Sequence, residues 1–171
     1  MIGDNSAQIS ILLDRVRQRT DPDDPLLEEF VRLWWSRIPE EDLLPRDAGN
    51  DSAASIECWQ AFRTRDPDAT EVHVSNPSAA RDGWHSRYTV VRVITPDMPF
   101  VTDSVLMALS HDGLVTHHLG NVVLSTERDG DGTVQALSTD RSWPTREVFI
   151  YAEIDRLPDA ELADLEHRLE T

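Results

Sequence analysis

The spacing of apolar residues changes within residues 88–114, and this change predicts a strand that leads into a helix. Residues 89–95 are rich in β-branched side chains, which is typical of a largely buried strand. From residue 98 the apolar positions follow one stripe of a helix, at Met98, Val101, Val105 and Leu109. Asp97 is a favourable N-cap for this helix, Pro99 suits its first turn, and Gly113 supplies a stop where positive φ is cheap.

The chain beyond residue 114 predicts two more strands and a closing helix. Residues 115–126 form the first of these strands, with a bulge expected at Gly120. The sequence Arg128-Asp129-Gly130-Asp131-Gly132 is typical of a hairpin turn, and we expect a polar loop from there to residue 145. Residues 146–154 alternate, which indicates a strand with one buried and one mixed face. The final helix follows Pro158, and its apolar stripe is Leu162, Leu165 and Leu169.

The first 80 residues predict helices and one short strand. A flexible N-terminal segment is expected to hold one amphipathic helix, with apolar positions at Ile9, Leu12, Leu13 and Val16. Further helices are predicted at 26–38, capped by Asp24, and at 53–63, with a turn-rich connection between them. A short strand is predicted at 71–75. The predicted divisions of the chain are a flexible segment at 1–25, a helical subdomain at 26–80 and an α/β unit at 81–171.

Composition narrows the functions that the chain could perform. Its 171 residues suit one domain, or one domain with a helical extension, and the 39% of apolar residues supports a folded core. The formal charge of −16 argues against a nucleic-acid partner. No apolar run approaches the ~20 residues needed to cross a bilayer, so we expect no membrane partner and a cytoplasmic location. All 16 basic residues are Arg, which excludes a lysine base, a Schiff-base lysine and a P-loop lysine.

Residue types that carry catalysis or bind metals are few in this sequence. Cys58 is the only cysteine, and we expect it to be a buried structural thiol. His117 and His118 are neighbours on a predicted strand and should point to opposite faces, which argues against a shared metal ion. The chain has neither a G-x-S-x-G nor a G-x-G-x-x-G motif. We therefore predict no catalytic residue, no metal and no cofactor in this segment.

Three short sequences, taken in order, resemble a known family. They are Gly83-Trp84, the stretch TPDMPFVTDSV from Thr95 to Val105, and Glu153-Ile154-Asp155-Arg156. This combination is similar to the N-terminal region of the large bacterial NAD-dependent glutamate dehydrogenases. Within it, residues 97–114 resemble the first strand–helix unit of an ACT domain, a small amino-acid-sensing βαββαβ module. The resemblance implies a ferredoxin-like antiparallel sheet with helices on one face, plus N-terminal helices.

The same resemblance implies a function. The chain would be a non-catalytic regulatory or assembly domain of an enzyme that converts L-glutamate and NAD to 2-oxoglutarate, ammonia and NADH. NAD would then belong to the parent enzyme, and the partners would be the remainder of the parent polypeptide, further copies of the chain and an amino-acid effector. Two alternatives remain: a stand-alone ACT-type amino-acid sensor, and a purely structural oligomerisation module.

The resemblance also implies an effector site at the turn before the first ACT helix. A helix N-terminus offers unpaired N–H groups to an anion such as a carboxylate. The residues expected there are Asp97, Phe100, Val101, Thr102, Asp103 and Ser104. Many effector-binding ACT modules have Gly where this chain has Phe100. The alternative is therefore a packed turn with Asp97 as a plain N-cap.

Two further expectations concern interfaces and completeness. Trp34 and Trp35 on one predicted helix, and Phe149 and Tyr151 on one predicted strand, are candidates for an oligomer interface. Packing inside the same chain is the alternative for both pairs. An ACT module needs a fourth strand after its second helix, and residues 81–171 lack one. Either the chain is the N-terminal piece of a longer polypeptide, or the strand at 71–75 fills the gap.

Overall fold

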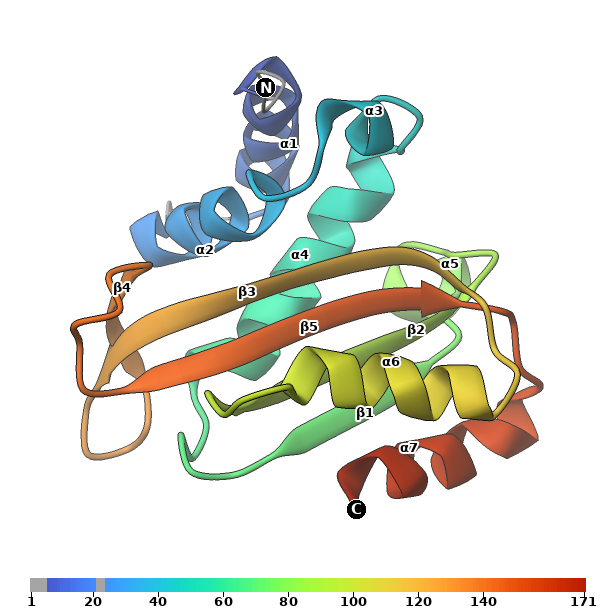
Figure 1. The fold of residues 1–171 in the computed structure, drawn as a ribbon. Coiled ribbons are helices and arrows are strands. Elements are labelled where there is room, and N and C mark those ends of the chain that lie inside the picture. The colour runs from blue at the N-terminus through green and yellow to red at the C-terminus, as the bar shows by residue number, and fades with distance from the viewer. Residues whose placement is uncertain (1–5, 21–23) are drawn as a thin grey trace.

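The structure, a computed structural model, describes residues 6–20 and 24–171. In these ranges the chain forms a five-stranded antiparallel sheet in the order β1-β2-β5-β3-β4, covered by helices on both faces (Figure 1). The strands are β1 (Glu71–Ser75), β2 (Thr89–Pro96), β3 (Thr116–Arg128), β4 (Val134–Ser138) and β5 (Arg146–Ile154). The helices are α1 (Ser6–Arg19), α2 (Pro25–Trp35), α3 (Glu40–Leu43), α4 (Ala48–Arg63), α5 (Ala79–Asp82), α6 (Val101–His111) and α7 (Leu162–Glu170), with the 3-10 turn η1 (Asp159–Glu161) before α7. The predicted α+β class is confirmed.

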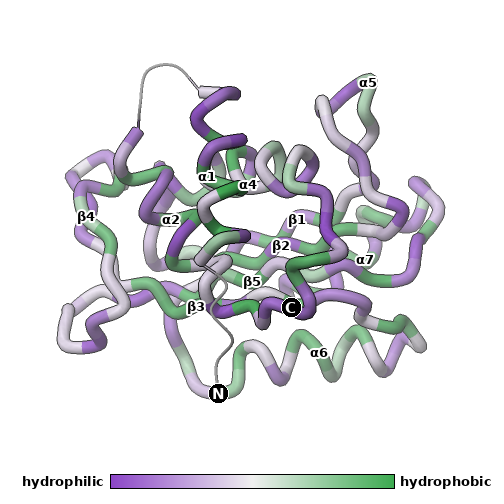
Figure 2. The backbone as a smooth tube through the Cα atoms, turned by 90° about the horizontal axis from the view of Figure 1, so that it is seen from above, coloured by the Kyte–Doolittle hydropathy of each residue, from purple (hydrophilic) through white to green (hydrophobic). Residues whose placement is uncertain are grey.

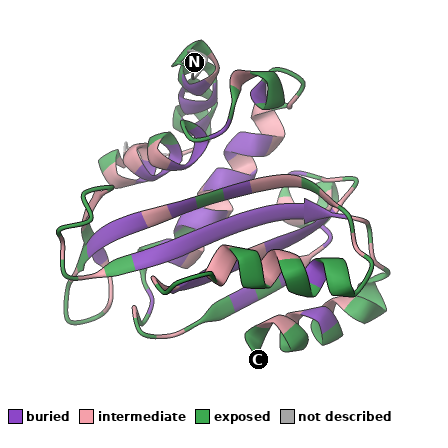
Figure 3. Ribbon diagram, viewed as in Figure 1, coloured by how far each residue is buried: buried purple, intermediate pink, exposed green. Residues whose placement is uncertain are grey.

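Strand β5 lies at the centre of the sheet, between β2 and β3. Its side chains are buried on both faces along almost its whole length (Figure 3). The strand was predicted to have one buried and one mixed face, because its outer side chains alternate with its apolar ones. The second face is buried because the N-terminal helices cover it.

The helices α1, α2 and α4 pack on one face of the sheet, and α6 lies on the other (Figure 2). The face under the N-terminal helices has an aromatic core. Phe30 and Trp34 of α2 meet Phe149 of β5 edge-on, with ring centroids 5.2 Å and 4.8 Å away. Trp34 also lies 5.1 Å from Tyr151. Of the two alternatives for these aromatic residues, the structure shows packing inside the chain.

The amphipathic helix predicted near the N-terminus is α1, and it is docked rather than loose. Its buried residues are Ile9, Leu12, Leu13 and Val16, which join the aromatic core. Residues 1–5 and 21–23 of the predicted flexible segment lie outside the described residues. Helix α4 begins at Ala48, five residues before the predicted start, because the Asp47 carboxylate accepts the N–H of Asn50 and caps it. No described helix combines the length and apolarity that a membrane span requires.

The predicted ACT-type helices α6 and α7 pack on the opposite face. Leu109 of α6 and Leu165 of α7 are fully buried there. Gly113 ends α6 as predicted: at φ 75° it donates its N–H to Ser110 O, and the N–H of Leu114 reaches Leu109 O. This pair of bonds is a Schellman motif, which satisfies the last carbonyls of the helix.

Strand β1 occupies the edge of the sheet beside β2, under α7. This is the position open to a strand that would follow α7 in a βαββαβ unit. The Glu166 carboxylate on α7 accepts the N–H of Val74, so the helix also covers part of the strand's free edge. The strand at 71–75 therefore fills the gap, and a division after residue 80 would separate β1 from the sheet to which it belongs.

Gly120 does not form the predicted bulge. It pairs regularly with Tyr151, and the register of β3 against β5 shifts at His117 instead. A glycine is needed at this position for a different reason. A Cβ here would lie 2.5 Å from Nε1 of the fully buried Trp34, which is too close. Gly120 thus gives the indole of Trp34 room to lie on the sheet.

The segment after the predicted hairpin turn contains a strand, β4, where a polar loop was expected. A buried cluster of charged side chains holds the strands beside β4 in place. The Glu147 carboxylate accepts bonds from Arg65, from Arg128 Nε at 2.9 Å and from Thr126 Oγ1 at 2.8 Å. Both Glu147 and Arg65 have fully buried side chains. The cluster joins the loop after α4 to β3 and β5, a connection that local sequence patterns do not reveal.

Replacing Gly120 by Ala should destabilise the protein by about 1–3 kcal/mol, because the new methyl group overpacks a rigid aromatic core. Urea unfolding monitored by fluorescence would measure the change. Gly130→Ala is the matched control, because a Cβ there meets nothing within 4 Å. Equal midpoints for the two variants would contradict this interpretation.

Replacing Glu147 by Gln should destabilise the fold by roughly 3–5 kcal/mol, because it removes the buried carboxylate that Arg65 and Arg128 share and leaves Arg65 only the half-exposed Glu71, 3.4 Å from its Nε. The surface pair Asp112–Arg168 provides the control, and Asp112→Asn should leave the unfolding midpoint nearly unchanged. Urea unfolding at neutral pH would compare the two. A Glu147→Gln midpoint equal to that of the wild type would show that the cluster contributes nothing to stability.

Candidate functional site

The predicted effector turn lies where β2 leaves the sheet, but its geometry differs from the prediction. Helix α6 begins at Val101, not Met98, and Asp97 does not cap it. Instead the N–H of Asp97 bonds to the carbonyl of Arg146, and its carboxylate accepts Arg146 Nε at 3.1 Å. These contacts extend the pairing of β2 with β5, so Asp97 serves the sheet rather than the helix.

Phe100 is the N-cap of α6, with a φ of 64° and no side-chain capping bond. A bulky residue in this left-handed region is uncommon. Phe100 is 76% exposed and Asp97 does not cap the helix, so the structure does not show the alternative of a packed turn with Asp97 as its N-cap. Of the other predicted effector residues, Val101 packs against the core, Thr102 accepts a bond from Asn121 at 3.3 Å, and Asp103 and Ser104 are exposed.

A shallow hollow of about 410 Å³ adjoins this turn. Its lining combines Asp97, Met98, Pro99 and Phe100 with Arg141 and Arg146. Of the six predicted effector residues, only Asp97 and Phe100 reach it. Effector binding at the turn stays a prediction.

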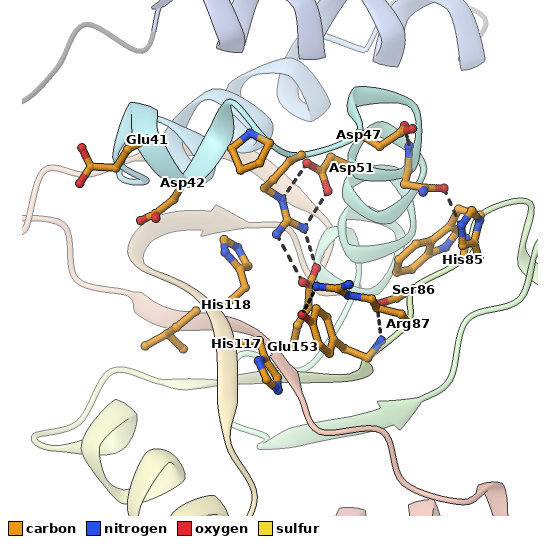
Figure 4. Close-up of a pocket in the computed structure, with 16 residues that line it drawn as sticks. Glu41, Asp42, Asp47, Asp51, His85, Ser86, Arg87, His117, His118 and Glu153 are labelled. Carbon is orange, nitrogen blue, oxygen red and sulfur yellow. Dashed lines mark hydrogen bonds and ion pairs between the residues drawn. The ribbon is translucent and has the colours of Figure 1, made fainter.

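A hollow of about 830 Å³ lies at the other end of β2 and β5 (Figure 4). It is enclosed by α3, the start of α4, the loop before β2, the start of β3 and the end of β5. Two of the three sequences that carry the family resemblance reach it, through Trp84 and Glu153. Sequence reasoning did not find this site, because its walls come from segments far apart in the chain.

Arg46 is the centre of the hollow's charged network. Its Nε and Nη2 each donate to the Asp51 carboxylate at 2.9 Å, and Nη2 also donates to Glu153 Oε1 at 2.5 Å. Its guanidinium lies 5.4 Å from the ring centre of Trp35. Burial opposes the charge of Arg46, but the two carboxylates outweigh it and raise the pKa of Arg46. For Asp51 burial prevails, and its pKa is raised.

His118 lies beside this network and stacks on Trp35, with ring centroids 6.0 Å apart. Its Nε2 is buried and makes no hydrogen bond to the described residues. Burial, followed by the nearby positive charge of Arg46, lowers the pKa of His118 to about 4. The imidazole is therefore neutral near pH 7.

His117 lies where the register of β3 shifts, so regular strand alternation does not apply to it, and it lines the rim of the same hollow as His118. It stacks on Tyr88 with ring centroids 4.3 Å apart, and its Nε2 lies 2.7 Å from Asp155 Oδ1. The Val115 N–H and His117 together lower the pKa of Asp155. Arg87 packs on Tyr88 at 4.8 Å from the ring centre. The rim is thus a stack of polar and aromatic side chains.

The described residues contain no group of three or more His, Cys, Asp or Glu side chains placed to hold a metal ion. Cys58 is buried in the helical layer, as predicted. Burial raises the pKa of its thiol to about 12, so it is not a reactive thiolate near neutral pH.

Comparison with known proteins agrees with this architecture. The family described as "Glutamate dehydrogenase, ACT1 domain" matches residues 30–169. The chain belongs to the glutamate dehydrogenase ACT1-domain family. The ACT1 match runs from the middle of α2 to the end of α7, so the family unit includes α2, α4 and β1 as well as the strand–helix unit.

Two curated relatives of this ACT1 chain are named NAD-specific glutamate dehydrogenase. The protein from Halomonas elongata is 32% identical over 163 residues, which is 92% of this chain and 10% of the relative. The protein from Pseudomonas aeruginosa is 34% identical over 146 residues, 83% of this chain and 9% of the relative. The chain therefore spans about a tenth of the length of these relatives. No solved structure matches it.

Protonation of His118 should destabilise the fold in acid. Its folded pKa of about 4 lies below the ordinary value of 6.5, so the unfolded chain binds the proton first. The stability that this residue contributes is complete above about pH 6.5 and is lost as the pH falls towards 4.

We expect His118→Gln to remove on the order of 2 kcal/mol of the stability difference between pH 7 and about pH 4.5. Urea unfolding at both pH values would measure it, and His85→Gln, at an exposed histidine of the same hollow, is the control. The carboxylates should contribute equally to the pH dependence of stability in the wild type and in both variants, so they cancel in the comparison. The same pH dependence in His118→Gln and wild type would refute the assignment.

Proposed function

We propose that the chain is a non-catalytic regulatory and assembly domain of a large NAD-dependent glutamate dehydrogenase. The observation that carries this proposal is the ACT1-family match over residues 30–169, in a chain that corresponds to a tenth of its NAD-specific relatives. The parent enzyme would oxidise L-glutamate to 2-oxoglutarate and ammonia and reduce NAD to NADH.

The chemistry of the chain supports a role without turnover. The sequence contains no lysine that could act as a base or polarise a substrate carbonyl. Its buried ionic groups are engaged in structure: Arg65 and Arg128 with Glu147, and Arg46 with Asp51 and Glu153. Hydride transfer and NAD binding are therefore assigned to other parts of the parent polypeptide.

The surface supports contact with other protein. The exposed large apolar residues include Met98 and Phe100 in the turn before α6 and Met107 on α6 itself. Exposed apolar side chains on a helix and its preceding turn suit a protein interface. The aromatic residues first considered for this purpose are inside the core, so we assign assembly contacts to α6 and its preceding turn.

The purified 171-residue chain should form no NADH from L-glutamate and NAD above the rate without protein. The regulatory part is tested in the Pseudomonas aeruginosa relative, by deleting the segment that matches this chain or replacing it with this chain. We expect deletion to change the oligomeric mass or the response to effectors, and replacement to restore it. Light scattering and steady-state kinetics would measure both.

Two results would contradict the proposal. One is glutamate-dependent NADH formation by the isolated chain. The other is a deletion that leaves mass, kcat, KM and effector response unchanged. As a control, the matching segment of the Pseudomonas aeruginosa relative is replaced by an unrelated folded domain of similar size. This control separates a specific role of the segment from the effect of uncovering the surface beneath it.

A further inference from the structure

The 830 Å³ hollow carries more negative than positive charge. Its lining includes five carboxylates and two arginines, which gives a net charge of −3 when its histidines are neutral. The carboxylates belong to Glu41, Asp42, Asp47, Asp51 and Glu153, and the arginines are Arg46 and Arg87. Such a lining attracts a cationic group and repels a simple anion.

The excess negative charge extends to the floor of the hollow. Asp51 and Glu153 are each only 7% exposed, and they share the single guanidinium of Arg46. One guanidinium balances one of the two carboxylates. A second cation that approached Glu153 would complete the neutralisation of a buried pair, where a charge-assisted hydrogen bond is strong.

The rim is polarised across the hollow. Glu41 and Asp42 lie on the side of α3, and His85, Ser86 and Arg87 lie on the facing loop (Figure 4). Among the described residues Arg87 has no ion pair; it donates only to the Tyr88 hydroxyl, at 2.6 Å. A guanidinium with free donors is a good partner for a carboxylate, which it can bind with two parallel bonds.

We propose that this hollow binds a small molecule through a primary ammonium group that donates to Glu153 and Asp51, while Arg87 donates to the carboxylate of a ligand that has one. Amino acids and diamines share the ammonium group, and the experiment separates them. A ligand site in the hollow rests on the proposed regulatory function and would place the effector there instead of at the turn before α6.

Three probes with related carbon chains test the ligand class by isothermal titration calorimetry of the 171-residue chain. L-Ornithine carries two ammonium groups and a carboxylate, putrescine carries the ammonium groups alone, and pentanoate carries the carboxylate alone. We expect ornithine to bind most tightly, putrescine to bind more weakly and pentanoate to give no binding heat. Pentanoate binding as tightly as ornithine would overturn the proposal.

Variants test the two ends of the ligand. Glu153→Gln should weaken ornithine and putrescine about tenfold each, because one charge-assisted bond is lost. Arg87→Gln should weaken ornithine by a similar factor and leave putrescine unchanged. Arg141→Gln, in the hollow beside Phe100, is the control and should change neither affinity.

Glu153 is part of a buried network, so each variant's thermal unfolding is measured first. If Glu153→Gln does not fold, Asp42→Asn on the exposed rim replaces it, and we expect it to weaken both cationic probes. Affinities unchanged in Asp42→Asn and in Arg87→Gln would place any binding elsewhere and reject the site.

The outcomes are distinguishable from failure of the proposed function. Absence of binding heat with all three probes rejects the ligand site. It does not change the results expected from the NADH and assembly experiments, which test the proposed function separately. Ornithine binding that is lost on substitution of Asp97 or Phe100 but kept in Glu153→Gln would return the effector to the turn.

Discussion

The contact on which the structure depends is aromatic: Phe30 and Trp34 of α2 lie against Phe149 and Tyr151 of β5. Aromatic side chains bury more apolar surface than any others, so this contact supplies a large share of the driving force for folding. It closes the second face of the central strand. For that reason the N-terminal helices and the sheet share one core, and the helices are not an independent subdomain attached to an ACT-like unit.

The same contact positions the charged hollow. Trp34 stacks on Trp35 at 4.5 Å, and Trp35 in turn supports both His118 and Arg46. A ring that is fully buried cannot shift without opening a cavity, so the indole of Trp35 holds the guanidinium above it in place. Gly120 belongs to this arrangement, because it admits Trp34 to the sheet. Apolar packing thus determines where an ionic network can form.

Local patterns were sufficient to predict the strands at 89–95 and 146–154 and the Gly113 stop, because each depends on residues close in sequence, whereas the ACT-like class of fold was predicted from the family resemblance. The charged networks could not be predicted. Arg46 meets Glu153 across 107 positions and Arg65 meets Glu147 across 82, and neither pairing leaves a periodic signal. Asp97 shows the same limit. Its sequence context favours a helix cap, yet pairing with Arg146 extends the sheet and overrides that preference.

The two ends of β2 and β5 suit opposite charges, and for this reason we place the proposed ammonium site in the hollow. The turn at one end offers helix N–H groups, but Asp97 lies beside them, and the exposed Phe100 gives little enclosure. The hollow at the other end is twice as large and is walled by five segments of the chain. Its floor also holds two buried carboxylates, Asp51 and Glu153, and excluding water from such groups strengthens each charged contact. A ligand that carries a positive charge therefore finds its strongest contacts at Glu153, on the strand that the aromatic core holds rigid.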